Sequence, residues 1–249
     1  MAYGNNKNKN NKESKMGKEN KKAENANVKQ EAVHIAPPNM QIGEIWIKGI
    51  SPLVIHKFSH KAKMAIKAKQ EAGSTAAKGK KKEAKDFVEC FNGARHLSLD
   101  GWDGIPAAAF RNACISACRL VGFKMSLAKL SIFILEDGWD ADEGTPLVKI
   151  IGGEPRMLES MVRVGGIQKV ADVSVRPQWL EWGARLRFRY DADQFRANDI
   201  INLLARVGMQ VGICEGRPDS TSSAGMGWGL FEISTKEEVM KLEKKGAKK

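Results

Sequence analysis

Residues 182–190 restrict the fold of this 249-residue chain more than any other segment, because apolar and charged side chains alternate along them. The apolar positions are Trp182, Ala184, Leu186, Phe188 and Tyr190, and the charged positions between them are Arg185, Arg187 and Arg189. Successive side chains of a β-strand point to opposite faces, so this segment predicts a strand with one face in a core and three arginines on the other. The arginine face is either a surface that binds anions or a merely exposed one, and the sequence leaves both interpretations open.

The order of the other apolar patterns predicts the fold class. Residues 41–50 alternate as a half-buried strand, with Ile45 and Ile47 on one face and Glu44, Trp46 and Lys48 on the other. We expect further strands at residues 127–135, 146–151, 169–175, 180–190 and 230–233. The strands at 169–175 and 180–190 are expected to pair with each other. Helices are expected after Pro106 and at residues 199–207. This order predicts an α+β fold, a ferredoxin-like (RRM-like) βαββαβ sandwich that leaves one face of its sheet open.

Composition divides the chain into a domain between two tails. Residues 1–36 are rich in asparagine and lysine and are expected to be disordered. The folded domain is expected to cover residues 37–235, with a basic insertion at residues 57–95 that contains a lysine-rich helix and a polar linker. Residues 236–249 are expected to form a basic C-terminal tail.

The formal net charge of +12 is concentrated in three lysine-rich segments. Residues 57–86 hold ten lysines against three acidic residues, residues 1–30 hold eight against three, and residues 236–249 hold six against three. Lysine-rich segments attract phosphate without sequence preference. The alternative is disorder that keeps the chain in solution, which we favour for the first thirty residues.

Other classes of protein find little support in the sequence. Apolar runs are much shorter than the ~18 residues of a membrane span, and the N-terminal segment does not resemble a secretory signal. We therefore expect a cytoplasmic protein without a membrane partner. Cys90, Cys114, Cys118 and Cys214 form no C-x-x-C pair and are expected to be reduced. The acidic run at residues 136–143 matches no calcium-loop spacing and predicts a solvated loop. We therefore expect no metal and no cofactor.

Six glycines fall within residues 208–231, between a helical apolar pattern and a short strand pattern. Glycine accepts positive φ and lets another chain approach closely, and a helix end that opens into such a loop offers N–H groups to phosphate. Arg217 and Trp228 add a charge for phosphate and a flat face for a base. The alternative is a surface loop in which glycine only ends a helix and turns the chain.

Several motifs resemble the RAMP superfamily of CRISPR-associated proteins. Ile47-Lys-Gly-Ile-Ser-Pro52-Leu53 is similar to its first strand, and Gly104-Ile-Pro-Ala-Ala-Ala-Phe110-Arg111 is similar to its helix entry, with Ala107 and Ala108 in place of a small polar pair. The stretch from Val175-Arg176-Pro177 to the loop Gly208–Gly229 resembles its second half.

The resemblance spans roughly residues 42–234 and is nearest to the backbone subunits that coat guide RNA as a filament, and to uncharacterised phage and prophage proteins. It implies that residues 57–95 are the inserted thumb of that superfamily. It also implies that the glycine loop lies against the nucleic-acid backbone.

These features together predict a non-enzymatic protein that coats single-stranded RNA or DNA as a head-to-tail homo-oligomer. The residues expected to bind nucleic acid are Trp46, Lys48, His56, Lys57, Lys61, Lys63, Arg111, Arg176, Arg185, Arg187, Arg189, Arg217, Gly225, Gly227, Trp228 and Gly229. One alternative is a metal-independent endoribonuclease with His56 as its acid–base group, by resemblance to some RAMP endoribonucleases. Another is a protein-interaction scaffold whose lysine tails only provide solubility.

Overall fold

The computed structural model describes residues 35–58, 60–71, 85–164, 170–220 and 225–246. The chain divides into the units Met1–Pro37 and Pro38–Lys249, and nearly all described residues belong to the second. The disordered tail predicted for residues 1–36 lies outside the described residues, apart from its last two positions.

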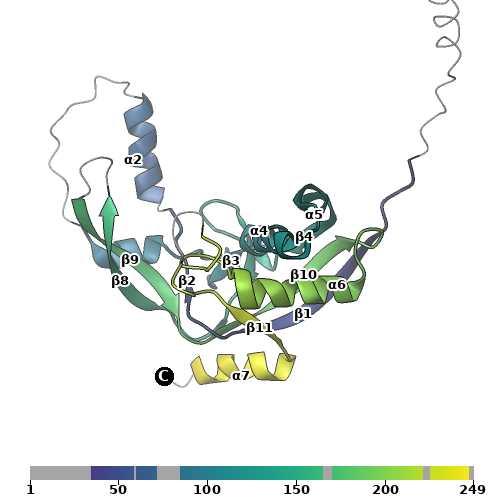
Figure 1. The fold of residues 1–249 in the computed structure, drawn as a ribbon. Coiled ribbons are helices and arrows are strands. Elements are labelled where there is room, and N and C mark those ends of the chain that lie inside the picture. Colours follow the sequence, from purple (N-terminus) through teal and green to yellow (C-terminus); the bar gives the residue numbers. More distant parts are fainter. Residues whose placement is uncertain (1–34, 59, 72–84, 165–169, 221–224, 247–249) are drawn as a thin grey trace, which may run out of the picture. The chain divides into compact units, whose positions relative to one another are not determined.

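The second unit contains both strands and helices (Figure 1). The strands are β1 (Met40–Gly49), β2 (Leu53–Val54), β3 (Gly104–Pro106), β4 (Ile132–Leu135), β5 (Gly138–Trp139), β6 (Pro146–Lys149), β7 (Ile151–Gly152), β8 (Arg156–Val164), β9 (Val170–Trp179), β10 (Trp182–Asp191) and β11 (Phe231–Ser234). The helices are α2 (His60–Glu71), α3 (Phe87–Gly93), α4 (Ala107–Ala117), α5 (Met125–Ser131), α6 (Ala197–Arg206) and α7 (Lys236–Gly246), with the short turns η1 (Cys118–Val121) after α4 and η2 (Val207–Val211) after α6.

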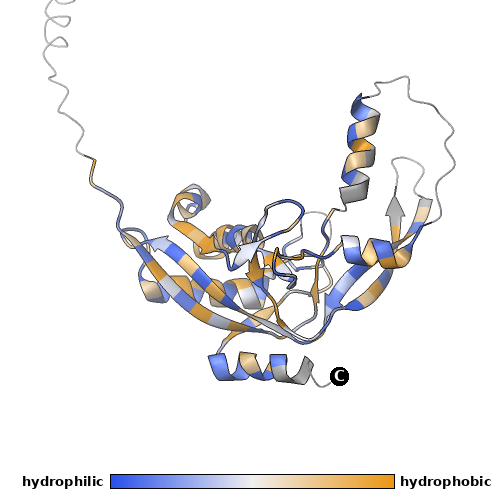
Figure 2. Cartoon of the chain, turned by 180° about the vertical axis from the view of Figure 1, so that it is seen from behind, coloured by the Kyte–Doolittle hydropathy of each residue, from blue (hydrophilic) through white to orange (hydrophobic). Residues whose placement is uncertain are grey.

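The main sheet has the strand order β11-β1-β10-β4, with β7 paired to the start of β10 and every pair antiparallel. Trp46 lies opposite Arg185, and Ile45 lies opposite Leu186. The alternation predicted for β1 and β10 is confirmed, because Ile45, Ile47 and Leu186 are buried. Figure 2 shows the same alternation as blue and orange bands along the two long strands.

Helices α4 and α6 cover one face of the main sheet (Figure 1). Phe110 of α4 packs edge-on against Phe231 of β11, and Phe231 in turn contacts the ring of Trp182 on β10. The indole N–H of Trp182 donates to the Ser51 carbonyl at 2.8 Å, so this buried tryptophan has its polar group paired. The core therefore lies between these helices and the apolar face of the sheet, and the chain has the predicted α+β architecture with antiparallel sheets.

Helix α7 lies on the opposite face of the main sheet (Figure 1). Val239 and Leu242 are buried there, and a Cβ atom at Gly183 of β10 would lie 2.8 Å from Val239 Cγ1. The segment that we expected to be a basic tail is thus, over residues 236–246, an amphipathic helix. Its apolar residues recur at helical spacing among the lysines, so the sheet face predicted to be open is partly covered.

Two smaller sheets accompany the main one. Strands β8 and β9 form a long antiparallel hairpin whose second strand also pairs with β2, and β6 lies between β3 and β5. The ends of the predicted insertion lie side by side, because the amide of Lys57 donates to the carbonyl of Ala94 at 3.0 Å. None of the helices in the described ranges is both long and apolar enough to cross a membrane.

Two strand predictions are wrong. Residues 127–131 belong to α5, and only Ile132–Leu135 of the strand predicted at 127–135 is extended. The strands predicted at 169–175 and 180–190 do not pair with each other, since β9 pairs with β8 and β2 whereas β10 pairs with β1, β4 and β7. Strand β8, which carries charged residues among its apolar ones, was not predicted.

Candidate nucleic-acid interface

Three side chains from three distant segments, His56, Arg176 and Glu215, meet in the glycine loop, and Arg217 follows two residues after Glu215. We call these four residues the loop cluster. The Nε of Arg176, on β9, donates to the Glu215 carboxylate at 2.6 Å. The same carboxylate lies 3.8 Å from Nδ1 of His56, which follows β2. Arg217 donates from Nη1 to the carbonyl of Cys214 at 2.9 Å. Three of the four residues are ones that the sequence predicts to bind nucleic acid.

The charge of the loop cluster favours an anion. Burial lowers the pKa of His56 and the guanidinium of Arg176 lowers it further, while the Glu215 carboxylate acts in the opposite direction. The imidazole is therefore neutral at pH 7. Within the loop cluster, Arg176 and Arg217 then carry two positive charges and Glu215 one negative charge, and the charge of Arg217 also acts on the nearby Asp219 carboxylate. The side chains of His56 and Glu215 are 44% and 38% exposed, so solvent and ligands reach them.

Backbone hydrogen bonds hold the glycine loop against the segment that follows β1. The amide of Glu215 donates to the Val54 carbonyl at 3.1 Å, and the amide of Gly229 donates to the Pro52 carbonyl at 2.8 Å. The Trp228 ring packs over Gly216, where a Cβ atom would lie 2.4 Å from Trp228 Cε3. The loop is therefore a fixed support for Arg217 and Trp228.

The glycines predicted to contact nucleic acid serve different purposes. Gly225, Gly227 and Gly229 all have positive φ, at 72°, 72° and 69°. A Cβ atom at Gly225 would lie 2.1 Å from the Arg217 carbonyl oxygen, and one at Gly229 would lie 2.0 Å from the Ile213 carbonyl oxygen. These two glycines are thus required by the packing of the loop itself. A Cβ atom at Gly227 would meet nothing within 4 Å, so only this position has room for another chain.

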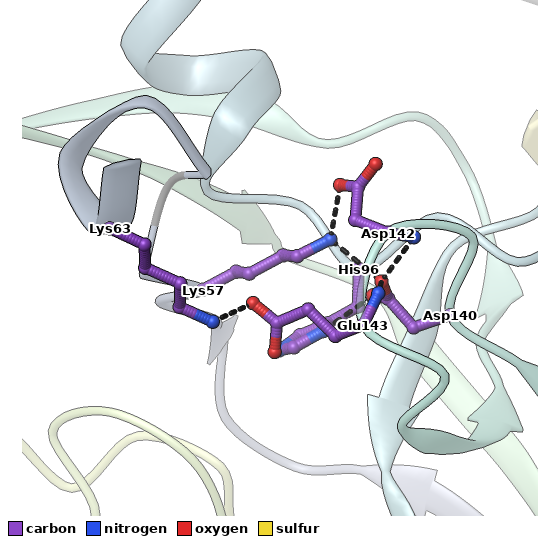
Figure 3. Close-up of polar contacts among 6 residues, drawn as sticks. All are labelled: Lys57, Lys63, His96, Asp140, Asp142 and Glu143. Atoms are coloured by element: carbon purple, nitrogen blue, oxygen red, sulfur yellow. Dashed lines mark hydrogen bonds and ion pairs between the residues drawn. The ribbon is translucent and has the colours of Figure 1, made fainter. Parts of the chain in front are cut away.

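The structure contradicts the prediction that Lys57 binds nucleic acid. Lys57 is 4% exposed, and its Nζ lies 2.8 Å from Asp140 Oδ1 and 2.6 Å from Asp142 Oδ2 (Figure 3). Nδ1 of His96 lies 2.9 Å from the other oxygen of Asp140. The prediction of a solvated acidic loop is therefore wrong for Asp140, which is buried, forms an ion pair with Lys57 and is hydrogen-bonded to His96.

The lysines of helix α2 are less constrained. Lys63 is exposed and forms an ion pair with Glu143 (Figure 3), and Lys67 lies 3.8 Å from Glu71 on the same helix. Exposed ion pairs of this kind are weak and exchange readily with phosphate. The side chain of Lys61 lies outside the described residues.

The predicted residues of the sheet face do not join the loop cluster. Arg185 and Arg187 both approach the carboxylate of Asp137, at 3.0 and 3.5 Å, and Lys236 of α7 lies 5.9 Å from the centre of the Trp46 ring. Lys48, on the same face of β1, is half-buried. These arginines are therefore partly neutralised, and α7 interrupts the continuous anion-binding surface that the sequence suggests.

Two further arginines lie at the edge strand β4. Arg189 and Arg111 each place a guanidinium carbon 5.0 Å from the centre of the Phe133 ring. Arg111 also donates from Nε to the carbonyl of Ile132 at 3.0 Å, which ties α4 to β4. The structure gives Arg111 a role in holding these elements together.

Sequence reasoning missed the acidic partners of the predicted cations: Glu215, Asp137 and Asp140. Glu215 lies inside the glycine loop beside Arg217, so its position in the sequence could have signalled a carboxylate at the site. Asp140 is 83 residues from Lys57, and no local pattern connects them. Among the described residues, no three His, Cys, Asp or Glu side chains are grouped so that they could hold a metal ion.

The chain matches no protein-family model and no curated protein sequence. Among solved structures, the chain is similar to one in the structure described as "Cryo-EM structure of the Type III-B Cmr-beta bound to cognate target RNA". The TM-score is 0.45 at 9% sequence identity, and the match covers 90% of this chain and 65% of that chain. The chain thus spans about two thirds of the length of this neighbour.

Proposed function

We propose that the protein binds single-stranded nucleic acid, RNA or DNA, without catalysis, through the loop cluster. The observation that carries this proposal is the contact of His56 and Arg176 with Glu215 in a glycine loop that also carries Arg217 and Trp228. Guanidinium groups bind phosphate in a bidentate manner, and an indole ring offers a surface on which any base can stack. These are the two kinds of contact that proteins make along a single strand.

We also propose that the domain is a RAMP-like member of the ferredoxin-like folds. When the two-residue strand β7 is set aside, β1, β4, β10 and β11 are the first, second, third and fourth strands of the main sheet along the chain, and they lie side by side in the order fourth, first, third, second. Helix α4 comes between the first two and α6 between the last two, which is a βαββαβ arrangement. The sequence resemblance over residues 42–234 supports the same assignment.

The proposed function includes assembly of several copies on one strand. Single-strand modules have sites of about 4–16 nucleotides, so one domain covers little of a long strand. The predicted insertion at residues 57–95, which we call the arm, exposes apolar side chains. Phe58, Met64 and Ile66 are 47%, 50% and 45% exposed. A contact between this arm and a different surface of the next copy is head-to-tail and leaves both ends free to grow.

Charge variants of the loop cluster test the binding site. Arg217→Gln should weaken binding of an unstructured oligonucleotide about tenfold at low salt and reduce the slope of affinity against salt, because one phosphate contact is lost. Glu215→Gln should have the opposite effect, since it removes the carboxylate that neutralises Arg176. Arg206→Gln, an exposed arginine of α6, is the matched control. Equal affinities for all three variants and the unmodified protein would favour the interaction scaffold and overturn the proposal.

One observation favours a second candidate, an endoribonuclease that works without metal. Glu215 lies 3.8 Å from Nδ1 of His56, and the lowered pKa keeps this imidazole neutral and able to accept a proton from a 2′-hydroxyl. A ribonuclease of this kind should cut RNA, leave DNA intact in the presence of a chelator, and lose activity in His56→Gln. Intact RNA after prolonged incubation with the unmodified protein would leave binding as its function.

A further inference from the structure

A cleft of about 350 Å³ lies on the face of the main sheet that α7 partly covers. Its walls include Trp46 on β1, Arg185 and Arg187 on β10, Trp102 in the turn before β3, Lys149 on β6, and Glu243 on α7. The volume falls in the range of pockets that bind small ligands. The loop cluster contributes no residue to this lining, so the cleft is a separate site.

The cationic side chains of the cleft are not fully neutralised. Asp137, 12% exposed, lies 3.0 Å from Arg185 and 3.5 Å from Arg187, and Glu44 lies 4.0 Å from Arg185, outside the lining of the cleft. The Nε of Arg187 is buried and has no hydrogen-bond acceptor among the described residues. A buried donor without an acceptor is costly, and an anionic oxygen would satisfy it. With Lys149 and Glu243 included, the lining has three positive charges against two negative ones.

The two tryptophans give the cleft aromatic walls. Trp102 is held in position by two glycines, since a Cβ atom at Gly138 would lie 2.7 Å from its ring and one at Gly104 would lie 3.1 Å from it. Trp46 is half-buried on β1, directly opposite Arg185 in the strand register. Fixed indole rings beside guanidinium groups provide stacking for a flat ring and charge for a phosphate at one place.

Helix α7 forms part of the cleft because its own packing fixes it there. Val239 and Leu242 are buried, and at Gly183 of β10 a Cβ atom would lie 2.8 Å from the first and 3.4 Å from the second. The next turn of the helix brings Glu243 to the cleft, together with Met240. The Glu243 carboxylate is a hydrogen-bond acceptor for the amino group of a base.

We propose that this cleft binds one nucleotide, either free or at the end of a strand. Its phosphate lies at Arg185 and Arg187, and its base lies along Trp46 and Trp102. This inference does not depend on the proposed function of the loop cluster, because the two sites share no residue.

Titration calorimetry with adenosine 5′-monophosphate tests the proposal. We expect one molecule to bind per chain, and adenosine or inorganic phosphate alone to bind at least about tenfold more weakly, because each lacks half of the contacts. Arg187→Gln and Trp46→Leu should each weaken binding about tenfold. Arg189→Gln is the matched control: it lies on the same strand face, does not line the cleft, and should change affinity less than about twofold. Thermal melts show whether each variant is folded. If Arg187→Gln is not folded, the affinity of Trp46→Leu decides whether the cleft binds the nucleotide.

Oligonucleotides with and without a 5′-phosphate separate the two sources of the ligand, and both are measured in an Arg217→Gln background that weakens the loop cluster. A strand end is the ligand if the phosphorylated oligonucleotide binds, if this binding depends on Arg187, and if free nucleotides do not bind. Free nucleotide is the ligand if the monophosphate binds and the 5′-phosphate on an oligonucleotide makes no difference. The proposal is overturned if neither the four common nucleoside monophosphates nor the phosphorylated oligonucleotide binds at millimolar concentration, or if Arg189→Gln loses as much affinity as Arg187→Gln.

Discussion

At the scale of single residues, Lys57, Asp140 and His96 form a buried ionic group that ties the base of the insertion to the turn after β5. Lys57 and Asp140 are 4% and 2% exposed. Removing one partner of such a pair leaves the other charge buried without compensation. We therefore expect Lys57→Met to lower the free energy of unfolding by about 3–5 kcal/mol. Lys63→Met, which breaks only the exposed pair with Glu143, should cost less than about 1 kcal/mol in the same urea titration.

His96 should make stability depend on pH. Burial lowers the pKa of His96 below its ordinary 6.5, even though Asp140 accepts a hydrogen bond from it. The unfolded chain therefore binds a proton at His96 more readily than the folded chain does. The contribution of His96 to the free energy of unfolding is complete above pH 6.5 and declines as the pH falls below that value. His96→Asn keeps an N–H donor near Asp140 and removes the titration. Urea titrations at pH 7.5 and 5.5 should show a smaller loss on acidification for this variant, and parallel losses would contradict the assignment.

At the scale of elements, the glycine loop has two kinds of glycine. Gly229→Ala and Gly225→Ala should destabilise the protein strongly, because the new methyl group would displace a backbone carbonyl in addition to straining φ. Gly227→Ala meets open space and should cost only the conformational strain of about 1–2 kcal/mol. Thermal melts measure these losses. If Gly227→Ala also weakens oligonucleotide binding while the protein stays folded, a strand approaches the loop at Gly227; unchanged binding would limit all three glycines to turning the chain.

The sequence predicts those elements whose signal is local. The alternation of β1 and β10 and the helical spacing of Phe110, Ala113 and Cys114 in α4 each depend on one stretch of chain, and all are found. The partners of those elements depend on distant residues: nothing near Lys57 points to Asp140, and nothing in β9 selects β8 over β10. Helix α7 was not predicted for a different reason. Lysines dominate the composition of residues 236–249, and only Val239 and Leu242 are buried on its apolar face.

At the scale of the whole molecule, helix α7 gives the two faces of the main sheet different surroundings. The loop cluster lies with β2 and β9, where the arm can supply additional positive charge to a passing strand. The cleft lies on the face that α7 partly covers, and its volume of about 350 Å³ suits a single nucleotide better than a continuous chain. A protein with both sites could hold a strand along its length and recognise a nucleotide separately, and the variants Arg217→Gln and Arg187→Gln should affect these two activities independently.

The arm provides the last prediction, which concerns assembly on a strand. Met64 and Ile66 are about half exposed on a helix surrounded by lysines, and we expect the next copy to cover them. The double variant Met64→Gln with Ile66→Gln keeps every lysine, so it should bind a short oligonucleotide with normal affinity but occupy a long one without cooperativity. Leu99→Gln, an exposed apolar residue outside the arm, is the control. Analytical ultracentrifugation with a long oligonucleotide should show multiple copies per strand for the unmodified protein and the control, and independent single copies for the double variant. One copy per strand for the unmodified protein at saturation, or unchanged assemblies for the double variant, would show that the arm is not the contact between copies.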